Sequence, residues 1–147
     1  SSDLNIDNCY KLYEKVKDDD INIVINNAGY GDFGDYTQTE IEKDLNMIDL
    51  NVKCVHVLTK LFVNNKSVKY ILNVASSAGL MRGGPLMATY YATKSYVCNY
   101  AIDKMFKKKL IIIPGASVKL GILFSRLLPT QLLLRITYKF QEKKKTP

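Results

Sequence analysis

The chain has 147 residues, of which 47% are hydrophobic and 24% are charged, a balance typical of a single globular domain and not of a disordered or fibrous protein. The formal net charge of +7 is unevenly spread: residues 1–103 hold 10 basic and 13 acidic residues, whereas residues 104–147 hold 11 basic residues and one acidic residue. Such a basic tail can attract nucleic acid or an anionic membrane, but a solvated lysine-rich end is commoner, and we expect no nucleic-acid partner.

The cysteines and the single histidine exclude several kinds of site. Cys9, Cys54 and Cys98 form no CxxC pair and leave an odd thiol, which argues against a disulfide framework or a zinc site and fits a reducing cytoplasm. His56 lies in a helical pattern and is expected to be structural, so we expect no metal site. The first 20 residues are polar and acidic, and no long apolar run follows. We therefore expect a cytoplasmic protein without a signal peptide or a transmembrane helix.

Helical and strand patterns alternate along the chain. We expect a helix over 7–17 with Asp7 as N-cap, a strand over 21–26, a helix over 39–64 that starts near Thr37 or Thr39, a strand over 68–74, a helix over 88–107 and a strand over 110–113. The strands are short β-branched runs, typical of burial on both faces. The order predicts an α/β fold with a parallel sheet flanked by helices. Glycine-rich segments 27–34 and 75–85 follow two of the strands, at the sheet edge where such folds hold their active sites.

Two apolar-periodic segments follow, over 118–128 and 131–140, separated by Pro129. The first carries a stripe of Leu120, Leu123, Phe124 and Leu127, and the second carries Leu132, Leu133, Ile136 and Phe140. Such helices suit either protein packing or the surface of a membrane. We expect them to pack on protein, as a helical hairpin or a dimer contact, with membrane contact possible but not favoured.

Tyr90 and Lys94 are four residues apart on a predicted helix and therefore share one face. A tyrosine hydroxyl is a poor acid or base at neutral pH, but a nearby ammonium favours the phenolate, so the pair can pass a proton to or from a substrate oxygen. Ser76 and Ser77 follow a strand and either bond a substrate carbonyl or satisfy loop backbone. Asn51 is unfavourable in the middle of a helix, which indicates a local task such as holding a water, or simple surface exposure.

Four motifs in this order resemble the short-chain dehydrogenase/reductase family: NNAG at 26–29, LNV at 50–52, N-x-x-S at 73–76 and YxAxK at 90–94. The strings INNAGYGDFGDY, MIDLNVK, ILNVASSAG and PLMATYYATKSYV are similar to one bacterial branch of that family. The resemblance covers about residues 3–103 and implies a partial Rossmann-like, doubly wound parallel sheet with flanking helices. It divides the chain into a truncated core of this kind over 1–115 and C-terminal amphipathic helices with a basic tail over 116–147.

By position, the resemblance implies that Tyr90 is the general acid/base and that Lys94 makes its hydroxyl more acidic and holds the nicotinamide ribose. Asn51 would keep a water in the proton relay. The catalytic serine matches Ser76, three residues after the strand asparagine; Ser77, which is 13 residues before the tyrosine as is usual in the family, stays as an alternative. The implied contacts with NAD or NADP come from Tyr90 and Lys94 together with Asp3, Asn26, Ala28 and Gly29.

The chain departs from the family pattern in two places. It contains no GxxxGxG motif, so the resemblance implies that about 60 residues carrying the phosphate-binding half are not in this sequence. Pro114-Gly115 is only 24 residues past Tyr90, closer than is usual. Either the helix is shortened or a block near 104–109 is deleted, and we favour the deletion.

Two functions fit these observations. The first is an NAD(P)-dependent oxidoreductase that moves a hydride between the nicotinamide and a small carbonyl or secondary alcohol, working as a homo-oligomer. The second is an inactive remnant of such an enzyme or a non-catalytic binding fragment. Catalysis needs a phosphate-binding loop at a helix N-terminus, so the presence or absence of that loop in the protein would distinguish the two functions.

Overall fold

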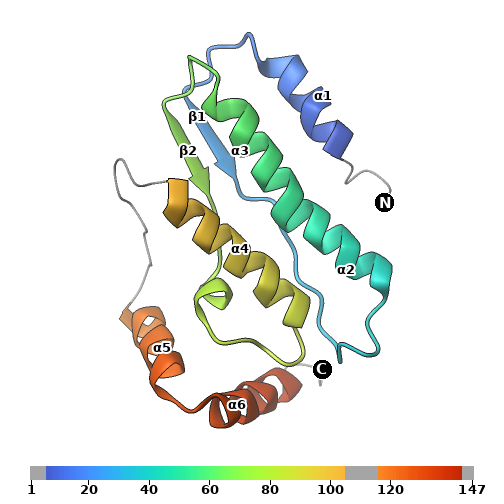
Figure 1. Cartoon of the computed structure of the whole chain (residues 1–147), viewed down its shortest axis with the longest axis vertical. Helices are drawn as coiled ribbons and strands as arrows, with labels where there is room; N and C mark the ends of the chain where they lie inside the picture. Colours follow the sequence, from blue (N-terminus) through green and yellow to red (C-terminus); the bar gives the residue numbers. More distant parts are fainter. Residues whose placement is uncertain (1–5, 105–115, 144–147) are drawn as a thin grey trace.

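The computed structural model describes residues 6–104 and 116–143 (Figure 1). Its elements are helix α1 (Ile6–Val16), strand β1 (Ile23–Asn26), helix α2 (Ile41–Ile48), the π-helical segment η1 (Asp49–Cys54), helix α3 (Val55–Val63), strand β2 (Tyr70–Asn73), the 3₁₀ turn η2 (Ser77–Leu80), and helices α4 (Ala88–Lys104), α5 (Ala116–Leu127) and α6 (Thr130–Lys143). The strand predicted over 110–113 lies outside the described residues.

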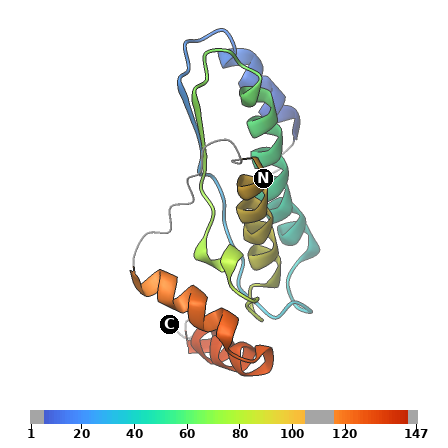
Figure 2. The same cartoon turned by 60° about the vertical axis from the view of Figure 1, so that its left-hand side comes forward.

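The two strands are parallel, with Ile23 opposite Tyr70 and Asn26 opposite Asn73. Helices α1 to α4 all lie on one side of this pair, so that strands and helices form two layers (Figure 2). The connection from β1 to β2 runs through α2, η1 and α3, as a parallel pair requires. The predicted α/β fold with a parallel sheet is therefore confirmed.

Burial of the strands on both faces is wrong for the described residues. Ile23, Ile25, Tyr70 and Leu72 are each more than half exposed, whereas the alternate residues of both strands are partly covered by α3. Side chains of a strand alternate between its faces, so helices on one side cover only every second residue. An apolar face of the sheet is left open to solvent.

The helix predicted over 39–64 is one continuous rod from Ile41 to Val63, but it is not α-helical throughout. Its N-cap is Glu40, one residue after Thr39, so the helix starts near Thr39 and not near Thr37. The middle six residues, Asp49–Cys54, form a π-helix. Single π-turns inside α-helices are rare and often mark functional sites, and this one carries Asn51.

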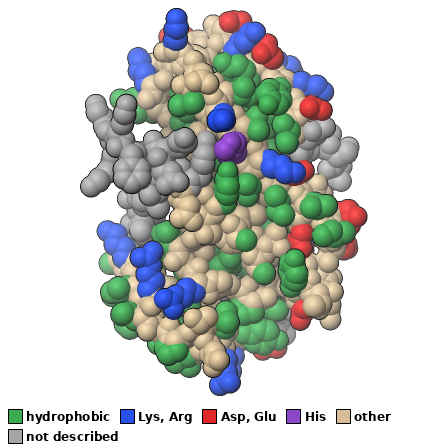
Figure 3. Space-filling view, in the orientation of Figure 1, with side chains coloured by type: hydrophobic (Ala, Val, Ile, Leu, Met, Phe, Trp, Pro, Cys, Tyr) green, Lys and Arg blue, Asp and Glu red, His purple; other side chains and the backbone are tan. Residues whose placement is uncertain are grey.

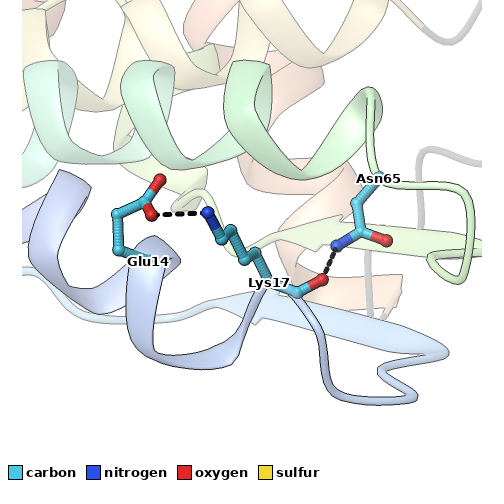
Figure 4. Close-up of polar contacts among 3 residues, drawn as sticks. All are labelled: Glu14, Lys17 and Asn65. Carbon is cyan, nitrogen blue, oxygen red and sulfur yellow. Dashed lines mark hydrogen bonds and ion pairs between the residues drawn. The ribbon is translucent and has the colours of Figure 1, made fainter.

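The best-buried side chains lie between the helices. Met47 of α2 and Val97 of α4 are each 1% exposed, and the Tyr13 ring meets the Phe62 ring edge to face at 5.2 Å between centroids. The end of α1 is held twice (Figure 4): the Lys17 ammonium pairs with Glu14 at 2.7 Å, and the Asn65 side-chain amide donates to the Lys17 carbonyl oxygen at 2.9 Å.

The two C-terminal helices are present where the apolar periodicity predicts them, and α6 begins directly after Pro129. Their buried residues are Ile122 and Ser125 of α5 and Leu133 and Gln141 of α6. The predicted apolar stripe of α5 is exposed, with all four of its side chains more than half accessible. A helical hairpin packed through that stripe is therefore wrong, because α5 turns its opposite side toward the rest of the chain.

Candidate active site

The carboxyl ends of β1 and β2 are joined by a cluster of polar side chains. The Asn26 side-chain amide donates to Asn73 Oδ1 at 2.7 Å and lies 3.1 Å from the Thr59 hydroxyl, which in turn donates to Asn73 Oδ1 at 3.2 Å. Asn26 and Thr59 are buried. Buried amides need partners, and these three provide them for one another. The cluster fixes where both glycine-rich loops leave the sheet.

The first of these loops is clasped by Asn51. The Asn51 Oδ1 atom accepts from the Tyr30 N–H at 3.1 Å, and its Nδ2 donates to the Tyr30 carbonyl oxygen at 2.8 Å. Asn51 is 1% exposed, so surface exposure does not explain it. Its side-chain amide bonds both the N–H and the carbonyl oxygen of Tyr30, as the backbone of a neighbouring strand does. The role of Asn51 in holding a water stays a prediction.

Thr93 connects this clasp to α4. Its hydroxyl accepts from Asn51 Nδ2 at 3.0 Å and donates to the Tyr90 carbonyl oxygen at 2.8 Å. The second bond is the back-bond to the preceding helical turn that threonine makes in helices. Asn51, the glycine loop and the Tyr90 turn of α4 are thereby linked into one hydrogen-bonded unit.

Tyr90 and Lys94 share one side of α4 as predicted. The Lys94 Nζ atom lies 5.9 Å from the centroid of the Tyr90 ring. The Lys94 side chain is buried, and Nζ reaches the glycine loop: a Cβ atom at Gly29 would lie 3.0 Å from Nζ and 2.9 Å from Asn51 Oδ1. Among the described residues, nothing forms a hydrogen bond or ion pair with this ammonium. The buried stem of Lys94 thus places its ammonium beside the exposed Gly29 loop.

Ser76 approaches the same helix further along. Its carbonyl oxygen accepts from the Cys98 thiol at 3.8 Å, and its hydroxyl accepts from the Ala78 N–H at 3.2 Å as the N-cap of η2. Cys98 is two turns beyond Tyr90 on α4, and no hydrogen bond in the described part joins Ser76 to Tyr90. The structure therefore unites Asn51, Tyr90 and Lys94 and places Ser76 on the adjoining turn.

The remaining predicted residues divide into three cases. Ala28 and Gly29 are exposed on the loop beside Lys94. Asn26 points its amide into the strand-end cluster, so its observed contacts are structural, and Asp3 lies outside the described residues. Thr93 and Thr59 were not predicted from the sequence. A threonine three residues after a candidate tyrosine on a helix is a usable signal, because it can bond the tyrosine carbonyl.

The loop before α4 is held by two distant segments. The Leu86 N–H donates to the Gln141 side chain of α6 at 3.2 Å, and the Leu86 carbonyl oxygen accepts from the Gly34 N–H at 2.9 Å. Gln141 also meets Tyr91; burial raises the pKa of the Tyr91 hydroxyl, and the hydrogen bond from Gln141 partly offsets that rise. Helix α6 thus docks beside the residue that follows Tyr90.

Two other features bear on chemistry. A shallow, mostly apolar groove of about 480 Å³ lies between the long helix and α4, lined by Tyr36, Ile48, Val52, Ala88, Thr89, Ala92 and Thr93. Thr93 is the residue that this groove shares with the hydrogen-bonded unit of Asn51 and the Tyr90 turn. Within the described residues, no group of three or more histidine, cysteine or acidic side chains is arranged to hold a metal ion.

The family model for short-chain dehydrogenases matches residues 3–107 of the chain. The chain belongs to the short-chain dehydrogenase family. No curated protein matched the sequence. The motif order from NNAG to YxAxK thus reflects descent, and the predicted family is confirmed.

Solved structures of this family resemble the chain in fold. A protein assigned as an NAD(P)-dependent gluconate 5-dehydrogenase from Beutenbergia cavernae, with NADP, is 18% identical with a TM-score of 0.64 over 71% of this chain and 43% of that one. A 4-hydroxyisoleucine dehydrogenase with NADH is 22% identical, with a TM-score of 0.63 over 71% and 48%. A short-chain dehydrogenase from Sphingobium yanoikuyae with NADPH is 25% identical, with a TM-score of 0.60 over 71% and 42%. The chain therefore spans less than half the length of these structures.

Proposed function

We propose that this chain supplies the proton-transfer half of an NAD(P)-dependent oxidoreductase that acts on a small carbonyl or secondary alcohol. The observation that carries the proposal is the buried Lys94 side chain, whose unpaired ammonium lies between the Tyr90 ring and the exposed Gly29 loop. The stem of Lys94 is buried, whereas its ammonium is not among the buried polar atoms that lack a partner, so the ammonium faces the Gly29 loop from a fixed stem and stays accessible to a ligand.

The chain's own residues account for the handling of the proton. The Tyr90 hydroxyl donates a proton to a substrate oxygen during reduction and accepts one during oxidation, and the Lys94 ammonium lies on the same side of α4. Asn51 and Thr93 keep the Tyr90 turn in place relative to the glycine loop. The Ser76 hydroxyl uses an acceptor lone pair at Ala78, which leaves its proton to donate to a substrate oxygen.

The described residues also fit the nicotinamide side of such a cofactor. Gly29 has no Cβ where one would crowd Asn51 and Lys94, which leaves room for a ligand to approach the backbone. The Lys94 ammonium has three donors to offer to ribose hydroxyl groups. A bound nicotinamide would supply the hydride. NAD and NADP fit this side equally, because they differ at the adenosine end.

The test measures hydride transfer to a panel of small ketones. The fall in absorbance of the reduced nicotinamide reports the rate. Reduced nicotinamide mononucleotide is compared with NADH and NADPH, since the chain has no GxxxGxG loop to grip a pyrophosphate. We expect turnover with the mononucleotide at high concentration and weak binding of both dinucleotides. The variants Tyr90→Phe and Lys94→Met should reduce turnover by about a hundredfold or more, as is usual when an acid/base group is lost.

The matched control is Tyr10→Phe, which removes the same hydroxyl from an exposed tyrosine of α1. It should leave turnover unchanged. Turnover that survives Tyr90→Phe would contradict the assignment of the acid/base. No turnover with any ketone and any reduced nicotinamide would favour the alternative, a non-catalytic fragment of the family.

A further inference from the structure

The exposed side of α5 is apolar from Leu120 to Leu127. Leu120, Leu123, Phe124 and Leu127 recur at steps of three and four, and they are 53%, 53%, 59% and 70% exposed. The buried residues Ile122 and Ser125 lie on the opposite side of the helix. The molecule therefore turns a weakly apolar side of α5 inward and its most apolar side outward, which is the reverse of a helix that covers a core.

Basic side chains run beside this stripe. Lys119 and Arg126 are seven residues apart and share the edge of α5 next to Leu123. On α6, Arg135, Lys139 and Lys143 form one exposed row at steps of four, next to a second exposed apolar row of Leu132, Ile136 and Phe140. Glu142 is the one acidic residue of 116–143, against five basic residues.

Figure 3 shows the result on the surface. Lysine and arginine side chains lie beside hydrophobic ones at the end of the molecule where Figure 1 draws α5 and α6, and others lie at the opposite end; on this face the acidic side chains lie mainly at the top and along the right edge. Apolar rows bordered by basic rows on short helices match an interface with an apolar interior and a negative rim. We propose that α5 and α6 dock the protein on an anionic membrane surface, with both helices lying in the plane of the bilayer.

Two other uses of this surface fit less well. No helix among the described residues is long and apolar enough to cross a membrane, so insertion across the bilayer is not what these helices provide. A second copy of the chain meeting the same face would bring Lys119 and Arg126 of both copies together, and like charges across an interface oppose association. Anionic lipid neutralises those charges while it takes up the apolar rows.

The test is flotation of the full chain with vesicles on a density gradient, which separates lipid-bound protein from aggregates. Vesicles of phosphatidylcholine alone are compared with vesicles that also contain phosphatidylglycerol, at low salt and at about 0.15 M salt. We expect flotation with the anionic vesicles at both salt concentrations. Phe124→Asp or Leu127→Asp should lower the partition coefficient by about tenfold or more, because a buried apolar contact is lost and a like charge faces the lipid. Arg135→Gln and Lys139→Gln should each lower it by about fivefold at low salt.

The control is Ile41→Asp, because Ile41 is an equally exposed apolar residue on α2, beside Glu40 and Glu42. It should not change flotation. The chain has no tryptophan, so Phe124→Trp gives a single fluorescent probe that leaves the stripe apolar. Its emission should shift to the blue with anionic vesicles, and that of Ile41→Trp should not. No flotation of the wild type, equal flotation of Phe124→Asp, or a dimer that Phe124→Asp dissociates without any vesicle binding would overturn the proposal.

Discussion

The hydroxyl of Thr93 is where three parts of the site meet. It is bonded to the amide of Asn51 and to the Tyr90 carbonyl oxygen, and Asn51 holds both backbone groups of Tyr30. Thr93 is 3% exposed, so water cannot readily replace it. Loss of the hydroxyl leaves a buried N–H of Asn51 without a partner, which costs about 1–3 kcal/mol.

We therefore expect Thr93→Val to destabilise the chain by about 1–3 kcal/mol, although valine fills nearly the same volume. Thr93→Ser keeps the hydroxyl and loses only a buried methyl group, at about 1 kcal/mol. Urea unfolding of the three proteins measures the difference. If Thr93→Ser proves the less stable variant, packing of the methyl group would be the main contribution of this residue and its hydrogen bonds would be secondary.

Cys9 is the buried residue of α1. Burial and the hydrogen bond with the neighbouring Cys54 thiol raise the pKa of Cys9 from 9.0 to about 12. Between these values the unfolded chain releases the Cys9 proton and the folded chain keeps it, so the free energy of unfolding falls as the pH rises through this range. Below pH 9.0 the contribution of Cys9 is fully present.

The pH dependence is measured by urea unfolding of the wild type and of Cys9→Ala across that alkaline range. The variant should lose less stability per pH unit than the wild type. Alkylation with iodoacetamide gives a second measurement, since only the thiolate reacts. Cys9 should be labelled slowly in the folded chain and rapidly in urea, and equal rates in the two states would contradict the assignment.

At the scale of elements, the turn η2 is seated on α4 with almost no clearance. A Cβ atom at Gly79 would lie 2.3 Å from the Lys94 carbonyl oxygen and 2.7 Å from the Cys98 sulfur. Gly79→Ala would push the turn off the helix that carries Tyr90 and Lys94, and overpacking of this kind costs about 1–3 kcal/mol.

A second glycine provides the matched control. Gly121 lies within α5, and a Cβ atom added there would have no neighbour within 4 Å, so Gly121→Ala should stabilise the helix by about 0.5–1 kcal/mol. The same substitution is thus expected to act with opposite signs at the two positions. Thermal unfolding of both variants measures this, and two destabilised proteins would show that α5 is more closely packed than its surroundings indicate.

Element type was readable from the sequence because periodicity reports which side of an element is apolar. The rod from Ile41 to Val63 and the helix that carries Tyr90 were both predicted in this way. The π-helical turn at Asn51 was not, because one extra residue per turn leaves the apolar spacing on either side nearly unchanged. Periodicity also gave the wrong burial for β1, since a β-branched run is the same whether one face is covered or two.

The site shows the same division between pattern and contact. Motif order brought Asn51, Tyr90 and Lys94 to one place, and the structure agrees. The inward orientation of Asn26 and the junction at Thr93 depend on which side chains meet across the helix layer. These contacts join residues that are tens of positions apart in the sequence, so the local spacing of residue types does not predict them.

For the whole molecule, the open face of the sheet is the feature with the largest effect on behaviour. Ile23 lies opposite Tyr70 and Ile25 opposite Leu72, so the four exposed side chains form one continuous patch. Exposed apolar patches favour association, and a strand edge that has no partner among the described residues adds backbone groups that can bond another chain. We expect this chain to self-associate in dilute buffer.

Ile25→Lys and Leu72→Lys should reduce that association, as measured by sedimentation velocity, because charge on the patch opposes stacking of two copies. Leu12→Lys is the control, since Leu12 is similarly exposed on α1 and lies away from the sheet. A wild-type chain that stays monomeric and unfolds in one sharp thermal transition would contradict the expectation.

The two backbone hydrogen bonds of Leu86 can show which parts of the molecule unfold separately. Its N–H is held by α6 through Gln141, whereas its carbonyl oxygen holds the N–H of Gly34 in the first glycine-rich loop. Deuterium uptake at these two amides therefore reports two separate events. Undocking of α6 exposes the Leu86 amide alone, and parting of the two loops exposes the Gly34 amide. A uniform rate at both would mean that the C-terminal helices and the loops around Tyr90 open together as one cooperative unit.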